Sequence, residues 1–212
     1  GLTVLSILAA IAIDLWIVRR VRGHEIFYHD GGKQGYRSVI AFGRVRVSLF
    51  QDDVRDTIYR DIYERFWDPA RRVFVQAAGS KALYASALLM PLIRFVSPTD
   101  PRWLSTLRAI EQELVSDSLV YRYRLDNGYT DGLTGQEGTF SMCSFWYVEC
   151  LSRMGDLHKA RFFFEKMLGY ANHLGLYGEE LGPQAQHLGN FPQAFTHLAL
   201  ISAAYDLDRR LS

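Results

Sequence analysis

The sequence has little cysteine and almost no net charge. Its 212 residues include two cysteines, and 24 Lys and Arg balance 23 Asp and Glu to a formal charge of +1. Cys143 and Cys150 lie in a stretch that is predicted to be helical, which would separate their Cα atoms by about 10 Å. This distance is too long for a disulfide. The lack of a disulfide framework therefore predicts a reduced, cytoplasmic protein. Because the net charge is so small, no overall electrostatic attraction draws the chain to nucleic acid, and any binding must come from a local site.

Metal-ligand spacing is missing as well. None of the six histidines stands at a spacing from either cysteine that is typical of a metal site. We therefore expect no metal and no cofactor. With 49% hydrophobic and 22% charged side chains, disorder is excluded and a packed core is expected.

One long apolar segment, Leu2–Val18, precedes a group of arginines. About 17 residues is the lower limit for crossing a bilayer, and the charge of Asp14 would be costly in hydrocarbon. The short length and the charge favour a buried core helix. A membrane anchor or a signal segment is the alternative. If the segment leaves apolar surface exposed, it favours self-association.

From Asp52 onward the hydrophobic pattern is helical and repetitive. Val54, Ile58, Ile62 and Phe66 recur every four residues, which predicts an amphipathic helix of about 14 residues. The further segments expected as helices are Ala82–Phe95 with a kink or early stop at Pro91, Pro101–Val115, Phe140–Met154, Leu157–Leu174 and Gln193–Arg209.

These helices alternate between nearly all-apolar and amphipathic ones. Two glycine-rich segments, Asp126–Gly138 and Gly175–Pro192, read as long loops between them. Stacked helical hairpins of this kind form either a solenoid or a closed α/α toroid. The predicted fold class is therefore all-α, with both loops opening at one end and placing Glu179 within reach of Arg122 and Tyr123.

The second loop concentrates the side chains that could react. Glu179 and Glu180 are adjacent, so in an extended backbone one faces a cavity and the other faces solvent. A solvated acidic loop tip is the plain alternative. Hydrogen-bonding and aromatic side chains that suit a sugar crowd the same segment: Tyr177, His187, Asn190, Phe191, Gln193 and Phe195.

Several strings resemble one enzyme family. GEELGP, LGNFPQAFTHLALISAA, EGTFSMCSFWYVECL, LVYRYRLDNGYTDGLTGQEGTF and FWDPARRVFVQAAGSKALYASALLMPLIRF are similar to the C-terminal half of the catalytic domain of glycoside hydrolase family 15, the glucoamylases, glucodextranases and bacterial trehalases. The resemblance covers roughly Asp52–Leu211. It implies an (α/α)6 toroid, or an incomplete portion of it, that forms one domain over 1–212 with 1–50 atypical and the N-terminal side incomplete.

The resemblance also implies a reaction, the inverting hydrolysis of a terminal α-linked glucose from an oligosaccharide or disaccharide. On this similarity the general base is Glu179, with Glu180 beside it. The substrate-binding residues implied are Arg122, Tyr123, Glu137, Phe140 and Glu180. Arg122 could instead serve a structural ion pair, Glu137 could cap a helix, and Trp146 is expected in the core.

The general acid of the family is expected in a Trp-Glu-x-Arg type motif, and the comparable string here is DLWIVR, with Ile17 at the glutamate position. Isoleucine cannot donate a proton, and Glu25 is the nearby carboxylate that could substitute. A catalytically inactive carbohydrate-binding or regulatory toroid is therefore the alternative function. The residues leave trehalose, maltose, isomaltose and glucans open as substrates.

Overall fold

The computed structural model describes residues 54–124 and 138–212 in two units. The first unit comprises Gly1–Arg65, and its described part is one helix over residues 54–65. This helix buries Ile62 and carries an exposed ion pair between Arg65 and Asp61 one turn apart. The expected amphipathic helix is therefore present, while Asp52, where the helical pattern begins, lies outside the described residues.

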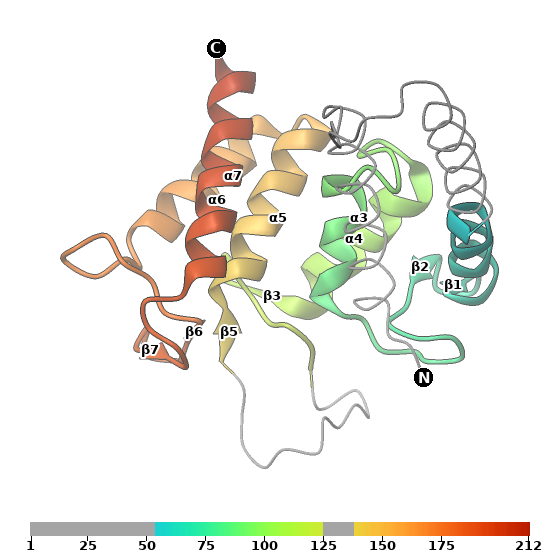
Figure 1. The fold of residues 1–212 in the computed structure, drawn as a ribbon, viewed down its shortest axis with the longest axis horizontal. Coiled ribbons are helices and arrows are strands. Elements are labelled where there is room, and N and C mark those ends of the chain that lie inside the picture. Colours follow the sequence, from blue (N-terminus) through green and yellow to red (C-terminus); the bar gives the residue numbers. More distant parts are fainter. Residues whose placement is uncertain (1–53, 125–137) are drawn as a thin grey trace, which may run out of the picture. The chain divides into compact units, whose positions relative to one another are not determined.

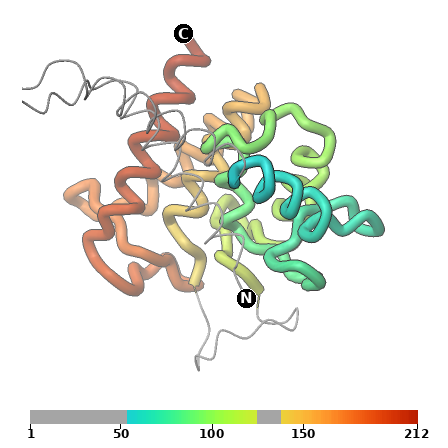
Figure 2. Tube along the Cα trace, turned by 45° about the vertical axis from the view of Figure 1, so that its right-hand side comes forward, coloured from blue at the N-terminus to red at the C-terminus, as the bar shows by residue number. Residues whose placement is uncertain are grey.

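The second unit, Phe66–Ser212, is built mainly of helices. A 3₁₀ helix η1 (Ala85–Leu88) leads into α3 (Leu89–Leu92), and longer helices follow: α4 (Pro101–Leu114), α5 (Ser141–Met154), α6 (Leu157–Leu168) and α7 (Ala194–Leu211). Helices α5 and α7 lie side by side and α6 packs against both (Figures 1 and 2). The all-α prediction is confirmed.

Two helix starts follow from short polar signals. The Asp100 carboxylate accepts hydrogen bonds from the Arg102 and Trp103 amides at 2.8 and 3.3 Å, and Pro101 stands in the first turn, where its missing N–H costs nothing. Asp156 accepts from the Lys159 amide at the start of α6. The sequence predicted both starts.

Two helices are shorter than expected. Most of Ala82–Phe95 is replaced by the short pair η1 and α3, after which Arg94 has a left-handed φ of 64°. Helix α6 ends at Leu168 instead of Leu174. Beyond it, the Asn172 side chain accepts hydrogen bonds from two later backbone amides and so stabilises a turn in place of further helix.

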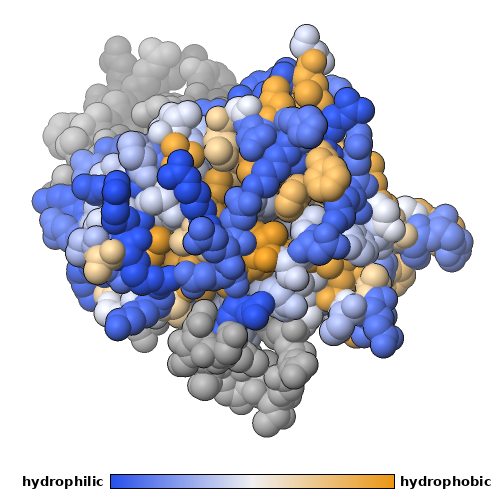
Figure 3. Space-filling view, turned by 180° about the vertical axis from the view of Figure 1, so that it is seen from behind, coloured by the Kyte–Doolittle hydropathy of each residue, from blue (hydrophilic) through white to orange (hydrophobic). Residues whose placement is uncertain are grey.

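The core centres on the apolar face of α5. Phe145 is fully buried, and its ring meets Tyr177 edge-on at a centroid distance of 5.4 Å. Trp146 packs against this cluster as a half-buried residue, in agreement with its expected role in the core. Cys143 and Cys150 are both buried and form no disulfide. From behind, the surface is largely hydrophilic with scattered hydrophobic groups (Figure 3).

Short strands connect the helices, and each is two residues long. They pair as β1 (Trp67–Asp68) with β2 (Val73–Phe74), β3 (Val115–Ser116) with β4 (Leu119–Val120), and β5 (Thr139–Phe140) with β6 (Glu180–Leu181), which also pairs with β7 (His187–Leu188). The last sheet lies at the end of α5 and α7 that is remote from the C-terminus (Figure 1).

Within the two described ranges, no helix is both long and apolar enough to cross a membrane. Leu2–Val18 is outside those ranges.

Candidate active site

The sheet β5–β6–β7 joins the two glycine-rich segments. Phe140 is paired in register with Glu180, which in turn is paired with Leu188. The Gly138 amide donates to the Glu180 carboxylate at 2.9 Å. The described end of the first segment is therefore held against the second, while residues 125–137 lie outside the described part of the chain.

Glu179 precedes β6 and continues the same ladder. Its amide donates to the Asn190 carbonyl at 3.0 Å, and its carbonyl accepts from the Ser141 amide at 3.1 Å. Its backbone is thereby fixed from both sides, by the start of α5 and by the segment leading into α7.

The two carboxylate oxygens of Glu179 differ. Oε2 accepts from the Asn190 amide at 3.1 Å and from the Asn190 side-chain amide at 3.0 Å. Within the described residues no donor contacts Oε1. The side chain is half-buried. Oε2 is thus held in place by two hydrogen bonds, while Oε1 is available to accept a hydrogen bond from a water molecule.

Arg122 lies on a surface formed by aromatic rings. Its guanidinium stands 4.6 Å from the ring centroid of Phe140 and 4.8 Å from that of Tyr123. It also donates to the Tyr123 hydroxyl at 3.1 Å, and Tyr123 is only 3% exposed. Contact with two rings and the bond to the Tyr123 hydroxyl hold the planar donor group in one orientation.

The register assigns the two glutamates to different faces. Glu180 is paired with Phe140, so both side chains leave the sheet on one face, where the ring meets Arg122. Glu179, one residue earlier, alternates to the other side and meets Asn190. The structure thus brings together Arg122, Tyr123 and Phe140, with Glu180 paired beside Phe140. The Glu179 side chain leaves the strand on the opposite face, so its contacts are with Asn190 and not with Arg122.

Other candidate residues fall elsewhere. Glu137, Ile17 and Glu25 lie outside the described residues. His187 approaches the Tyr170 carbonyl at 2.8 Å and packs beside the Phe191 ring. Within the described residues, no three His, Cys, Asp or Glu side chains form a group that could hold a metal ion.

Two residues with structural roles at the site were missed from the sequence. Gly189 has φ +72°, and a Cβ there would lie 2.7 Å from Glu179 Oε2, so only glycine fits. His197 on α7 approaches the Gln193 carbonyl through Nδ1 at 2.7 Å and accepts from the Tyr177 amide at 3.4 Å. A Leu-Gly-Asn string is the signal that could have indicated Gly189, since glycine often marks a left-handed turn.

The helical arrangement defines the class of protein. A solved glycosidase superposes on 76% of this chain and 45% of its own, with a TM-score of 0.63 at 19% identity. A variant of a glycosidase in complex with glucose gives a TM-score of 0.64 at 18% identity, with the same coverage. The fold is therefore that of an α/α-toroid glycosidase, or an incomplete portion of that toroid.

Sequence comparison identifies the family. The model for "Glycosyl hydrolases family 15" matches residues 33–205, and the chain belongs to this family. Trehalases of Mycobacterium tuberculosis and Mycolicibacterium smegmatis are 49% and 46% identical over 157 residues, which are 74% of this chain and 23% of each relative. The Thermoplasma acidophilum trehalase is 43% identical over 73% of this chain and 26% of its own length. The chain thus spans about a quarter of these relatives.

Proposed function

We propose that residues 1–212 form part of one catalytic domain that hydrolyses an α-glucoside, with trehalose as the preferred substrate. The family and the similarity to three trehalases support this substrate class. The observation that carries the chemistry is the asymmetry of Glu179, whose Oε2 is held by Asn190 while Oε1 has no donor within the described residues.

In this proposal Glu179 is the general base of an inverting reaction. Oε1 accepts a proton from water as the water oxygen attacks the anomeric carbon, and the glucose is released with inverted configuration. The two hydrogen bonds to Oε2 hold the carboxylate in one orientation. Arg122, Tyr123, Phe140 and Glu180, on the neighbouring face of the same sheet, are proposed to bind glucose hydroxyls, with Glu137 as a further contact.

The leaving oxygen needs a general acid. The family match begins at residue 33, so the DLWIVR string lies outside it, and Ile17 within that string has no proton to give. A protein that lacked this acid would have the second candidate function, that of an inactive carbohydrate-binding or regulatory toroid. Two buried cysteines that form no disulfide support the cytoplasm as the proposed compartment.

An α-glucosyl fluoride separates the two functions, because fluoride leaves without protonation. The unmodified chain should hydrolyse this fluoride faster than trehalose or maltose, since loss of general acid assistance slows natural glycosides about 10²- to 10⁴-fold. Proton NMR should show β-glucose as the first product.

Two matched variants test the base. Glu179→Gln should abolish fluoride turnover, because a neutral amide cannot accept the proton. Glu180→Gln should reduce it far less, since the amide oxygen can still accept from the Gly138 amide. Full turnover by Glu179→Gln would remove Glu179 from the mechanism. Glucose binding without any turnover by the folded, unmodified chain would instead identify the inactive binding domain.

A further inference from the structure

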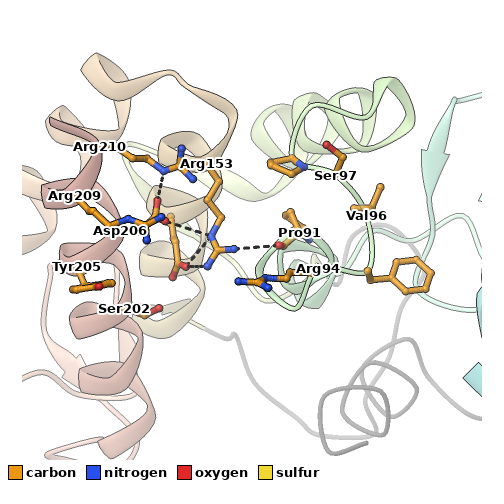
Figure 4. Close-up of a pocket in the computed structure, with 13 residues that line it drawn as sticks. Pro91, Arg94, Val96, Ser97, Arg153, Ser202, Tyr205, Asp206, Arg209 and Arg210 are labelled. Atoms are coloured by element: carbon orange, nitrogen blue, oxygen red, sulfur yellow. Dashed lines mark hydrogen bonds and ion pairs between the residues drawn. The ribbon is translucent and has the colours of Figure 1, made fainter. Parts of the chain in front are cut away.

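A cavity lies away from Glu179. It has a volume of about 530 Å³ and is formed by the segment after α3, by α5 and by the C-terminal half of α7 (Figure 4). Glu179 contacts Asn190 just before the other end of α7. The cavity is therefore separate from the candidate active site, and its volume is in the range of small-molecule sites.

Basic groups outnumber acidic ones around this cavity. Four arginines and two acids line it: Arg94, Arg153, Arg209, Arg210, Glu149 and Asp206. The side chains leave a formal excess of two positive charges. An anion is therefore the favoured ligand.

The two acids already have arginine partners. Arg153 donates to the buried Glu149 carboxylate at 2.5 Å, and Arg210 donates to Asp206 at 2.8 Å. Asp206 also accepts from the Ser152 hydroxyl at 2.8 Å. These pairs fix one wall of the cavity and leave little acidic charge for the other two arginines.

Arg94 and Arg209 make no ion pair within the described residues. Figure 4 shows Arg94 extending from its turn toward α7, where Arg209 and Tyr205 lie. Arg94 sits at a φ of 64°, a conformation that favours glycine. The hydrogen bond from the Phe95 amide to the Met90 carbonyl at 2.8 Å forms this turn without using the Arg94 side chain. The turn itself therefore does not require an arginine.

We propose that this cavity binds a phosphate group, either free or carried by a small phosphorylated sugar. Guanidinium groups match phosphate oxygens with paired N–H donors, and Arg94 and Arg209 supply them from two sides. The Ser202 and Tyr205 hydroxyls line the same cavity and can contact the rest of a phosphorylated sugar. The site is independent of the proposed hydrolysis.

The test is calorimetric titration of the full chain at low ionic strength with inorganic phosphate, glucose 6-phosphate and glucose. Phosphate and glucose 6-phosphate should bind and glucose should not bind at this site. Tighter binding of glucose 6-phosphate than of phosphate identifies a phosphorylated sugar as the ligand, whereas equal binding identifies free phosphate. Raising the salt concentration should weaken both, because the site is open to solvent.

Arg94→Gly is the decisive variant, because glycine suits the left-handed turn and the fold should be kept. Its affinity for phosphate should fall about tenfold or more, as expected for the loss of one charged hydrogen-bonding group. Arg209→Gln should act similarly. Arg72→Gly is the matched control, since Arg72 is also an exposed arginine with φ 57° and does not line the cavity.

Unchanged affinity in Arg94→Gly and Arg209→Gln would overturn the proposal, as would an equal loss in Arg72→Gly. Absence of phosphate and glucose 6-phosphate binding to the unmodified, folded chain would overturn it too. Circular dichroism of each variant confirms that the helices are retained.

Discussion

Gly189→Ala should disturb the candidate base through a single added methyl group. The new Cβ would lie 2.7 Å from Glu179 Oε2 and 3.0 Å from Glu179 Cβ, both well inside ordinary contact distance, so the carboxylate must move. The move loosens its two hydrogen bonds from Asn190. Turnover of α-glucosyl fluoride should fall about tenfold to hundredfold, the cost of misplacing a reacting group by about 1 Å.

Gly175→Ala is the control that measures the backbone strain alone, without the contact with Glu179. Gly175 has φ +75°, close to the +72° of Gly189, but nothing lies within 4 Å of its added Cβ. Left-handed strain should cost each variant about 1 kcal/mol of unfolding free energy. Gly189→Ala should lose about 1–3 kcal/mol more, for the weakened charged hydrogen bonds.

Urea unfolding measures the stability difference, fluoride release measures turnover, and hydrogen exchange of the Asn190 amide reports directly on its bond to Glu179. Faster exchange is expected in Gly189→Ala alone. Equal losses of turnover in both glycine variants would refute the reasoning, because the contact with Glu179 would then have no part in the effect.

Three further predictions concern the core and the site. Phe145→Ala should cost about 3–5 kcal/mol in urea unfolding, whereas Phe162→Ala, at a side chain 52% exposed, should change stability by about 0.5 kcal/mol or less. Burial raises the pKa values of Tyr147 and Tyr177. The unfolded chain loses these tyrosine protons near pH 10. The free energy of unfolding should therefore keep its full value below pH 10 and fall above it by up to about 1.4 kcal/mol per pH unit for each tyrosine. In Tyr147→Phe the fall should be less steep. Asn190→Ala should slow fluoride turnover about tenfold, because Glu179 loses one of its two donors.

Helix starts were the part of the fold most readily predicted from sequence. Asp100 and Pro101 act on the first turn that follows them, and Asp156 does the same for α6. Each signal and its effect lie within about three residues, so neither depends on how the rest of the chain folds.

The apolar run Ala82–Phe95 was predicted less well, because its backbone partners lie elsewhere in the chain. The Ala82 carbonyl accepts from the Gln76 amide, and the Ala85 amide donates to the Arg122 carbonyl at 2.8 Å. Backbone groups paired in this way cannot join a helical ladder at the same time. A continuous apolar pattern is compatible with either arrangement, since both bury the same side chains.

The candidate site shows why residue types were predictable and their partners were not. Two adjacent glutamates in an extended segment must point to opposite faces, but the pattern alone cannot assign the faces. The assignment depends on pairing between strands of two residues that lie 40 positions apart, Phe140 with Glu180. A slip of one residue would exchange the surroundings of Glu179 and Glu180. Two sets of hydrogen bonds oppose that slip: one from the Ser141 amide to the Glu179 carbonyl, and those from Asn190 to the Glu179 carboxylate. The start of α5 and the turn around Gly189 therefore together determine which carboxylate has an oxygen available for water.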